Sequence, residues 1–533
     1  MSASLEDPRR ELRRAVYGLL IVVSVGTMIG RIWTVQSSLG ETPLLSANDR
    51  SRWCTVRALV DHGTYVIDDV IFKDRERKKR DREWYPIDMV RHKGHDGQEH
   101  YYSSKPPLLS TLVAWQYWAI KHTTGATLTE RPFYVVRLIL IITNVLPLAL
   151  YLCLLARMVE RYGTTDWGRL FVVGAAAFGT FLTTFAVTLN NHVVAAVSVA
   201  IALCAALPIW RDGERRWWYF AIAGLFAAFT AANELPALSF FGLVGLALFW
   251  RSPGRTLLAF VPAAAVVAAG FFATNWQAHN SWRPPYAHRG NGPLLVTVEG
   301  DFHRQLDGGS IPTDLRTRID EAGVKLSRQA VAGLRATEDG WFLWDREGHD
   351  RLAVVPETGG VRVHAWDNWY EYDRSYWVTG KKTGVDLGEQ SRAAYAFHVL
   401  LGHHGVFSLT PIWLLSAVGI CLWMNRKDER MRGFAVFVLT LTLVCLAFYL
   451  ARPLKDRNYG GVSCGFRWMF WFTPLWLVAM VPAVDRFASR RVLRYLAGAL
   501  LLVSVVSAAY ALLNPWSHPW LYRYWAYLGW AEL

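Results

Sequence analysis

The chain has 533 residues, of which 53% are apolar and only 19% are charged, and it contains 26 tryptophans. Lysine and arginine outnumber aspartate and glutamate by 57 to 43, so the formal charge is +14. This composition argues against a disordered chain and against an ordinary soluble enzyme. Basic residues beside long apolar segments are typical of the cytoplasmic loops of membrane proteins, so we predict an integral membrane protein with no nucleic-acid partner.

The first apolar segment, residues 15–30, follows arginines at positions 9, 10, 13 and 14. It lacks the small-residue cleavage site that a secretory signal peptide would need before Arg31 and Trp33. We therefore interpret this segment as a membrane span that is retained.

Nine more windows without a formal charge follow along the chain, and a membrane span needs about 20 largely apolar residues. The window 170–210 is long enough for two spans, and Asn190, Asn191 and His192 at its middle predict a tight hairpin. The sequence thus predicts an α-helical polytopic membrane protein with eleven spans. The nine windows are 138–156, 170–210, 217–233, 235–250, 256–278, 405–425, 433–451, 468–484 and 495–522.

The apolar run Leu108–Ile120 has 13 residues, which is too short for a crossing and suits an interfacial helix. When this run is not counted as a span, the short arginine-rich loops, such as 211–216 and 251–255, all lie on the side of the N-terminus. Positively charged short loops face the cytoplasm. We therefore predict a multi-pass protein of the inner (plasma) membrane with a cytoplasmic N-terminus and an extracytoplasmic C-terminus.

Two large polar segments fall outside the cytoplasm in this topology. The second of them is rich in tryptophan and tyrosine, and the alternating residues 361–364 after Gly359 and Gly360 predict a small mixed or β-rich domain. The predicted organisation is a cytoplasmic N-terminus (1–14), a first span (15–34), an extracytoplasmic loop with interfacial helices (35–131), spans two to seven (132–278), an extracytoplasmic domain (279–402), spans eight to eleven (403–513) and an extracytoplasmic tail (514–533).

The six cysteines form no CxxC motif and no zinc-type spacing, so they predict neither a disulfide framework nor a structural metal site. Cys54 and Cys464 both lie outside the spans on the oxidising face. The sequence leaves open whether they pair.

Polar residues that are unusual in a membrane protein gather at the extracytoplasmic ends of the predicted helices, which predicts a site at that face of the membrane. Each has a simpler interpretation as well: a turn for the hairpin residues, a helix start for Glu234, and an interface for the paired histidines. The residues are Asp49, Lys105, Asn191, His192, Glu234, His403, His404 and Arg467.

Two of these residues stand in distinctive local sequences. Lys105 lies between Tyr101-Tyr102-Ser103-Ser104 and two prolines, which stiffen the backbone and hold the ammonium at the membrane surface. Arg467 ends the glycine-rich segment 460–467, where exposed amides and a guanidinium suit a phosphate.

Taken in order along the chain, these motifs resemble the GT-C superfamily of polyprenyl-phosphate-sugar-dependent glycosyltransferases, in particular relatives of bacterial aminoarabinose transferase and protein O-mannosyltransferase. The resemblance covers residues 1–275 well and the rest loosely. The matching pieces are Asn48-Asp49-Arg50-Ser51-Arg52-Trp53, residues 57–63 ending in Gly63, Ser104-Lys105-Pro106-Pro107-Leu108, Arg137, and the Gly-Gly-Val-Ser-Cys-Gly-Phe-Arg segment that ends at Arg467.

The chain departs from the family pattern at two places. It has Asn48-Asp49 where the family commonly has Asp-Glu, so one carboxylate remains from the acidic pair. It has Asn191-His192 where the family tends to have an acid in the hairpin between the third and fourth spans. This second departure leaves both a metal site and the partner of Lys105 undefined.

The resemblance implies transfer of a sugar from a polyprenyl-phosphate donor to a hydroxyl of a lipid, glycan or protein acceptor on the extracytoplasmic face, with inversion at the anomeric carbon. It gives Asp49 the role of general base and gives Lys105 and Arg467 the donor phosphate. No cofactor is certain, although a divalent metal is possible. Site-lining candidates are Asn48, Tyr102, Asn191, His192, Glu234, His403 and His404.

Two other functions are compatible with the sequence. A flippase or transporter of a lipid-linked sugar would move its substrate without covalent transfer, and it would carry ionisable groups deeper within the spans. A non-catalytic envelope scaffold would account for the extracytoplasmic domain but would give no reason for the Lys-Pro-Pro motif or for Asp49.

The predicted topology can be tested with reporters fused after Leu533. Alkaline phosphatase is active only outside the cytoplasm, so we expect an active phosphatase fusion and an inactive cytoplasmic reporter at this position. An inactive phosphatase together with an active cytoplasmic reporter would reverse the assigned orientation.

Overall fold

The computed structural model describes residues 8–74, 76–336, 338–345, 350–378, 380–426, 429–512 and 514–531. The beginning of the predicted cytoplasmic N-terminus (1–7) and the last two residues of the predicted tail lie outside the described residues.

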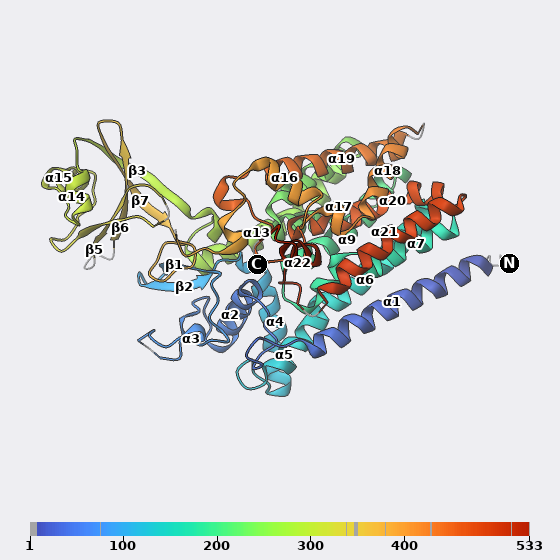
Figure 1. Cartoon of the computed structure of the whole chain (residues 1–533), viewed down its shortest axis with the longest axis horizontal. Coiled ribbons are helices and arrows are strands. Elements are labelled where there is room, and N and C mark those ends of the chain that lie inside the picture. The colour runs from blue at the N-terminus through green and yellow to red at the C-terminus, as the bar shows by residue number, and fades with distance from the viewer. Residues whose placement is uncertain are drawn as a thin grey trace.

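A bundle of long helices and a small sheet domain occupy opposite ends of the molecule (Figure 1). The N-terminus lies at the end of the bundle that is far from the sheet, and the C-terminus lies between the bundle and the sheet domain. The first large loop, with α2 (Ala47–Asp61) and the hairpin of β1 (Met89–Lys93) and β2 (Glu99–Ser103), lies at this same junction. The polar segments of the sequence are therefore collected at one end of the apolar bundle.

Eight helical segments among the described residues are long and apolar enough to cross a membrane. Several contain short breaks where proline or a wider turn interrupts the regular α-helical hydrogen bonds. They comprise α1 (Pro8–Thr34), α5 (Pro132–Leu140) with α6 (Leu146–Tyr162), α7 (Asp166–Phe178) with α8 (Phe181–Thr184), α9 (Asn191–Asp212), α12 (Pro253–Arg255) with α13 (Val261–His279), α19 (Glu429–Leu450), η8 (Arg467–Phe472) with α20 (Thr473–Phe487), and α21 (Arg491–Tyr510).

Three shorter apolar helices fall on the remaining predicted windows: α10 (Trp217–Asn233), α11 (Leu238–Arg251) and α18 (Trp413–Met424). Each predicted window therefore contains a helix, although the window 495–522 is not helical between Tyr510 and Trp520, and the count of eleven crossings stays a prediction. The window 170–210 is divided as expected, because the chain turns at residues 188–190 and the side chain of Asn190 caps α9 by accepting the Val193 amide at 2.9 Å.

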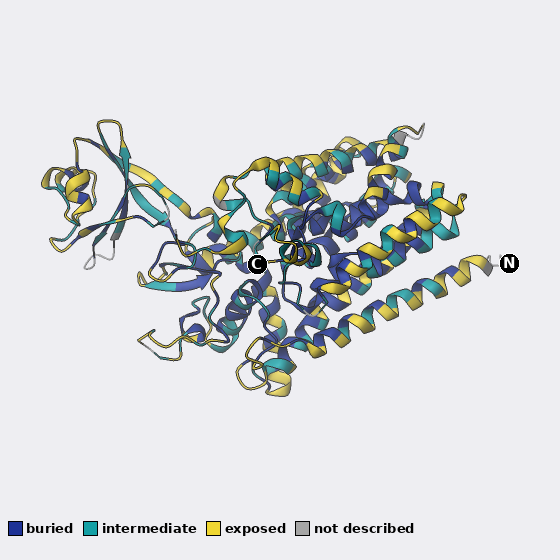
Figure 2. Cartoon of the chain, in the orientation of Figure 1, coloured by how far each residue is buried: buried dark blue, intermediate teal, exposed yellow. Residues whose placement is uncertain are grey.

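Burial separates the helices into a central and a peripheral set, as Figure 2 shows. The apolar windows of α7–α8 and of η8–α20 are 83% buried, whereas those of α1 and α21 are 28% and 22% buried. The peripheral helices expose leucine, valine and aromatic side chains, which lipid would cover. The central helices α9 and η8 begin at Asn191 and Arg467, so these two polar residues lie at one end of the tightly packed core.

The first large loop folds into α2 (Ala47–Asp61), α3 (Asp68–Ile71), the strands β1 (Met89–Lys93) and β2 (Glu99–Ser103), and α4 (Pro107–Thr124). The two strands form an antiparallel hairpin in which Met89 is opposite Ser103. The predicted interfacial helix is α4, which begins at Pro107 and ends at Gly125, where a φ of 70° favours glycine. With 18 residues it is longer than the predicted 13-residue run, but it is not among the helices that are apolar enough to cross a membrane.

The segment 279–402 contains a five-stranded antiparallel sheet with the strand order β3-β7-β6-β5-β4. Helices α14 (His303–Asp307) and α15 (Thr313–Glu321) contribute to a separate small core with residues such as Leu315, Leu343 and Val361. The predicted small mixed or β-rich domain is therefore confirmed. Its strands are β3 (Arg289–Glu299), β4 (Val331–Leu334), β5 (Trp341–Asp345), β6 (Asp350–Glu357) and β7 (Gly360–Asn368).

The chain returns from the sheet to the bundle through α16 (Arg392–Leu400) and α17 (Val406–Leu409), and it ends with α22 (Trp520–Tyr527). Cys54 and Cys464 are both buried, and neither forms a disulfide. The Cys54 thiol instead donates to the carbonyl oxygen of Trp84.

Candidate functional site

Helix α2 begins with a capping box formed by Ser46 and Asp49. The Ser46 hydroxyl accepts the amides of Asn48 and Asp49 at 3.1 and 3.4 Å. The Asp49 carboxylate accepts the Ser46 amide at 2.7 Å and the Leu45 amide at 3.1 Å. Its side chain is 1% exposed, and burial raises its pKa above the usual value of a carboxyl. The predicted base is thus held rigidly at the N-terminus of α2.

Lys105 forms an ion pair with Asp88, with 2.9 Å between Nζ and Oδ2. The β1–β2 register produces this contact, since Asp88 precedes Met89 and Lys105 follows Ser103 and Ser104. The Ser104 amide also donates to the Asp88 carbonyl oxygen at 3.2 Å. The hairpin therefore supplies the partner of Lys105 that the sequence left undefined.

Arg52 extends from α2 toward the bundle, and its side chain is buried. It donates to the Asn191 side-chain oxygen at 2.6 Å and to the Asn48 carbonyl oxygen at 3.0 Å. Asn191 in turn donates to Glu234 Oε1 at 2.7 Å. These bonds join the first loop, the start of α9 and the end of α10.

His192 lies between Glu234 and Arg467. Its Nδ1 contacts the Glu234 carboxylate, and its Nε2 lies 3.0 Å from Arg467 Nη1. An arginine can only donate, so Nε2 must accept and Nδ1 must carry the proton that is donated to Glu234. The three side chains are therefore fixed in one orientation.

The glycine-rich loop approaches Arg467 closely. Arg467 Nε donates to the Gly460 carbonyl oxygen at 2.6 Å, and the guanidinium lies 4.7 Å from the Trp516 ring centroid. Gly460 has a φ of 93°, and a Cβ at this position would lie 2.4 Å from Arg467 Nε. Only glycine fits both the backbone conformation and the contact.

Three cations, Arg52, Lys105 and Arg467, thus converge from separate elements. Burial lowers the pKa of Lys105 to about 8, and repulsion from Arg52 and Arg467 opposes the attraction of Asp88. Burial also lowers the pKa of Arg52 to about 10, with a further contribution from Arg467. A bound anion would relieve this repulsion, so the cluster suits a phosphate.

Carboxylates lie among these cations. Burial raises the pKa of Asp88, but Lys105, followed by Arg467 and Arg52, outweighs it and holds the pKa below its usual value. Arg52 also interacts with Asp49, so the capped carboxylate belongs to the same charge cluster.

Residues at the start of β3 and in the segment after β7 lie beside the cluster. The Arg289 guanidinium lies 4.1 Å from the ring centroid of the buried Tyr370. Asp386 accepts the Tyr376 hydroxyl at 3.0 Å, and burial raises its pKa although Arg467 attracts it. The segment 279–402 thus contributes side chains to the site.

The structure brings most of the predicted site residues together: Asn48, Asp49, Lys105, Asn191, His192, Glu234 and Arg467. The Tyr102 ring stacks on His92, with 4.3 Å between the ring centroids, and packs with Val90 and Tyr370, so its site-lining role stays a prediction. Alternation along β2 turns it away from the side used by neighbouring Ser103. His403 and His404 lie in a different cluster with Glu389 and His398.

The sequence did not single out Asp88, Arg52 or Asp386. The local sequence contains a pattern that could have indicated Asp88. Two short segments of mixed polar and apolar residues flank Gly94 and Gly97, which is typical of a β-hairpin, and pairing them places residue 88 beside residue 105. Arg52 belongs to the segment Asn48–Trp53 that carries the family resemblance, but its partner Asn191 is 139 residues away. No local pattern indicates Asp386.

No family model matches the chain, and no curated protein matches it. Among solved structures, the chain is similar to the S. cerevisiae protein O-mannosyltransferase Pmt1–Pmt2 complex bound to the sugar donor, with 11% identity and a TM-score of 0.47 over 100% of this chain and 93% of that one. It is also similar to the Archaeoglobus fulgidus oligosaccharyltransferase in complex with Zn and sulfate, with 13% identity and a TM-score of 0.42 over 95% of this chain and 53% of that one.

A further structure of the A. fulgidus enzyme, AglB with an inhibitory peptide and a dolichol-phosphate, has 14% identity and a TM-score of 0.40 over 97% of this chain and 57% of that one. The chain therefore spans about half the length of the oligosaccharyltransferase.

The capping role of Asp49 can be measured separately from any activity. Asp49→Ala removes the acceptor of the Ser46 and Leu45 amides, so we expect a loss of about 1–2 kcal/mol of stability and a lower unfolding temperature in detergent. The control is Glu41→Ala, which removes an exposed acid from the same loop. Equal unfolding temperatures for the two variants would contradict the capping role.

Proposed function

We propose that the protein is an integral membrane glycosyltransferase that moves a sugar from a polyprenyl-phosphate donor to an acceptor hydroxyl on the extracytoplasmic face. The observation that carries this proposal is the convergence of Arg52, Lys105 and Arg467 beside Asp49 and Asp88 at one end of an apolar helical bundle. A lipid phosphate needs both features, because its head group is anionic and its tail is apolar.

The donor phosphate lies against Lys105 and Arg467 in this proposal, with its polyprenyl chain along the apolar helices. Lys105 acts as a point charge, and Arg467 acts as a planar donor held by Gly460 and His192. Both neutralise the charge that grows on the phosphate as it leaves. Asp88 holds Lys105 in place and is a positioning residue.

Asp49 is the proposed general base. Burial raises its pKa, whereas Lys105 and the two arginines lower the pKa of Asp88, so Asp49 is the stronger proton acceptor of the two. Its Oδ1 accepts hydrogen bonds from Ser46 and Arg50, and its Oδ2 accepts one from Leu45. Oδ2 therefore keeps a lone pair for the acceptor hydroxyl.

The proposed step is a single displacement. The acceptor oxygen forms a bond to the anomeric carbon while its proton passes to Asp49. The bond from the anomeric carbon to the phosphate oxygen breaks, and its electron pair leaves with the polyprenyl phosphate. Attack opposite the leaving group inverts the anomeric centre, as the family resemblance implies.

A transfer assay with a radiolabelled polyprenyl-phosphate sugar and a membrane extract tests the proposal. We expect label in a new product with the wild-type protein, at least about a hundredfold lower kcat for Asp49→Asn, and a similar loss of kcat/KM for Lys105→Ala. Asparagine keeps an acceptor for the α2 cap, so Asp49→Asn is expected to fold. Label that only crosses the bilayer would indicate a flippase instead.

Asp88→Asn is the matched carboxylate variant. It loosens Lys105 without removing the base, so we expect the donor KM to rise about tenfold while kcat changes less. The reverse pattern, with full kcat in Asp49→Asn and loss of kcat in Asp88→Asn, would transfer the base assignment to Asp88.

Donor binding is also expected to depend on pH through Lys105. The ammonium is charged below its pKa of about 8 and neutral above it, so affinity falls as the pH rises through this value. Donor affinity of the wild type should therefore be lower at about pH 9.5 than at about pH 7. Lys105→Arg stays charged at both pH values, so its affinity should change less between them. Equal pH profiles would contradict the role of the Lys105 charge.

A further inference from the structure

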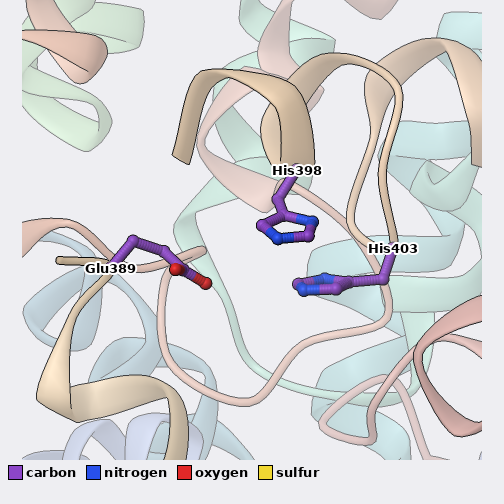
Figure 3. A group of neighbouring side chains, drawn as sticks. All are labelled: Glu389, His398 and His403. Atoms are coloured by element: carbon purple, nitrogen blue, oxygen red, sulfur yellow. The ribbon is translucent and has the colours of Figure 1, made fainter. Parts of the chain in front are cut away.

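A second cluster of polar side chains lies where the chain returns from the sheet domain to the bundle. It contains Glu389, His398 on α16, and His403 in the turn after α16, and one ligand atom from each lies within 4.8 Å of the others. Figure 3 shows both imidazole rings on one side of a small gap, with the Glu389 carboxylate turned toward them. This cluster is not used in the proposed transfer.

Hydrogen bonds from the segment 457–459 hold Glu389 in this position. The Tyr459 hydroxyl donates to Glu389 Oε1 at 2.6 Å, and the Glu389 amide donates to the Arg457 carbonyl oxygen at 2.9 Å. Arg457 Nη1 returns a bond to the Glu389 carbonyl oxygen at 3.2 Å. The second carboxylate oxygen is thus left to face the histidines.

The imidazole rings of His398 and His403 lie close to each other. Their ring centroids are 4.0 Å apart with an interplanar angle of 16°. His403 Nδ1 is 2.6 Å from His404 Nδ1, so its Nε2 is the nitrogen available to a ligand. His398 Nδ1 is buried without a hydrogen-bond partner, which is costly for a polar atom.

The close packing of the turn against the His398 ring requires glycine at position 402. A Cβ at position 402 would lie 2.5 Å from His398 Nδ1 and 2.8 Å from His398 Cα. The turn from α16 to His403 therefore folds tightly over the His398 ring, and it brings together two imidazoles that are five residues apart in the sequence.

We propose that Glu389, His398 and His403 bind a zinc ion. Two neutral imidazoles and one carboxylate form a ligand set that zinc prefers, with a fourth tetrahedral position for water. Zinc bonds of about 2.0–2.2 Å place ligand atoms roughly 3.3 Å apart, so the rings must rotate and move inward by about 1 Å. Rotation of the half-buried His398 side chain permits this movement.

A metal at this position would connect the segment after the sheet to the loop that carries Arg467. Glu389 is bonded to Tyr459, the residue before Gly460, and the Gly460 carbonyl oxygen holds Arg467. The Tyr459 ring also stacks on His404 at 4.0 Å. The metal would thus fix the geometry of the loop, and it takes no part in the bond-forming step.

Zinc binding can be measured on the full-length protein in detergent, purified with a tag that contains no histidine and then stripped with a chelator. After incubation with Zn²⁺ and gel filtration, we expect about one zinc per chain by elemental analysis. Glu389→Gln keeps an acceptor for Tyr459, and we expect it and His398→Gln each to weaken zinc affinity at least about tenfold. His303→Gln, an exposed histidine in the sheet domain, is the control and should bind as the wild type does.

The proposal is overturned if wild-type protein retains less than about one zinc in ten chains, or if both variants bind zinc as tightly as the control. Gel-filtration profiles and unfolding temperatures establish that each variant is folded. If His398→Gln does not fold, Glu389→Gln alone tests the proposal. The readout is metal content, so it is independent of whether sugar transfer is detected.

Discussion

The hydrogen-bonded series Arg52–Asn191–Glu234–His192–Arg467 is the interaction on which the site depends. Its ionisable members Arg52, Glu234, His192 and Arg467 are buried, and a buried charge is costly unless it is paired and hydrogen-bonded. Removing one member would leave its partners unsatisfied. The series therefore fixes the first loop and the glycine-rich loop against the starts of α9 and η8, and every other feature of the site is positioned relative to it.

Local geometry then places the reactive groups around this series. The capping box fixes Asp49 at the start of α2, and the β1–β2 register sets Asp88 beside Lys105. The same burial that stabilises the bundle changes the protonation of these groups, since it raises the pKa of Asp49 and lowers that of Lys105. Fold and chemistry thus share one cause, the exclusion of water from the end of the bundle.

His192 and His403 show what the local sequence cannot predict. Both histidines lie beside another polar residue, Asn191 for His192 and His404 for His403, and both are predicted site-lining residues. The structure separates them, because His192 points to Glu234 and Arg467 whereas His403 stacks on His398 beside Glu389. Similar local patterns therefore lead to different partners, Glu234 and Arg467 for His192 but His398 and Glu389 for His403.

The sequence by itself determined the elements that depend on short-range hydrophobicity and backbone chemistry: the helical windows, the turn before α9, the helix α4 and the β-rich domain. It also indicated Lys105 and Arg467 through their proline and glycine neighbours. Only the tertiary structure decided which polar groups meet, and it gave Lys105 its partner Asp88. The physical reason is that the decisive contacts join residues up to 275 positions apart, where pairing is set by helix packing and not by local pattern.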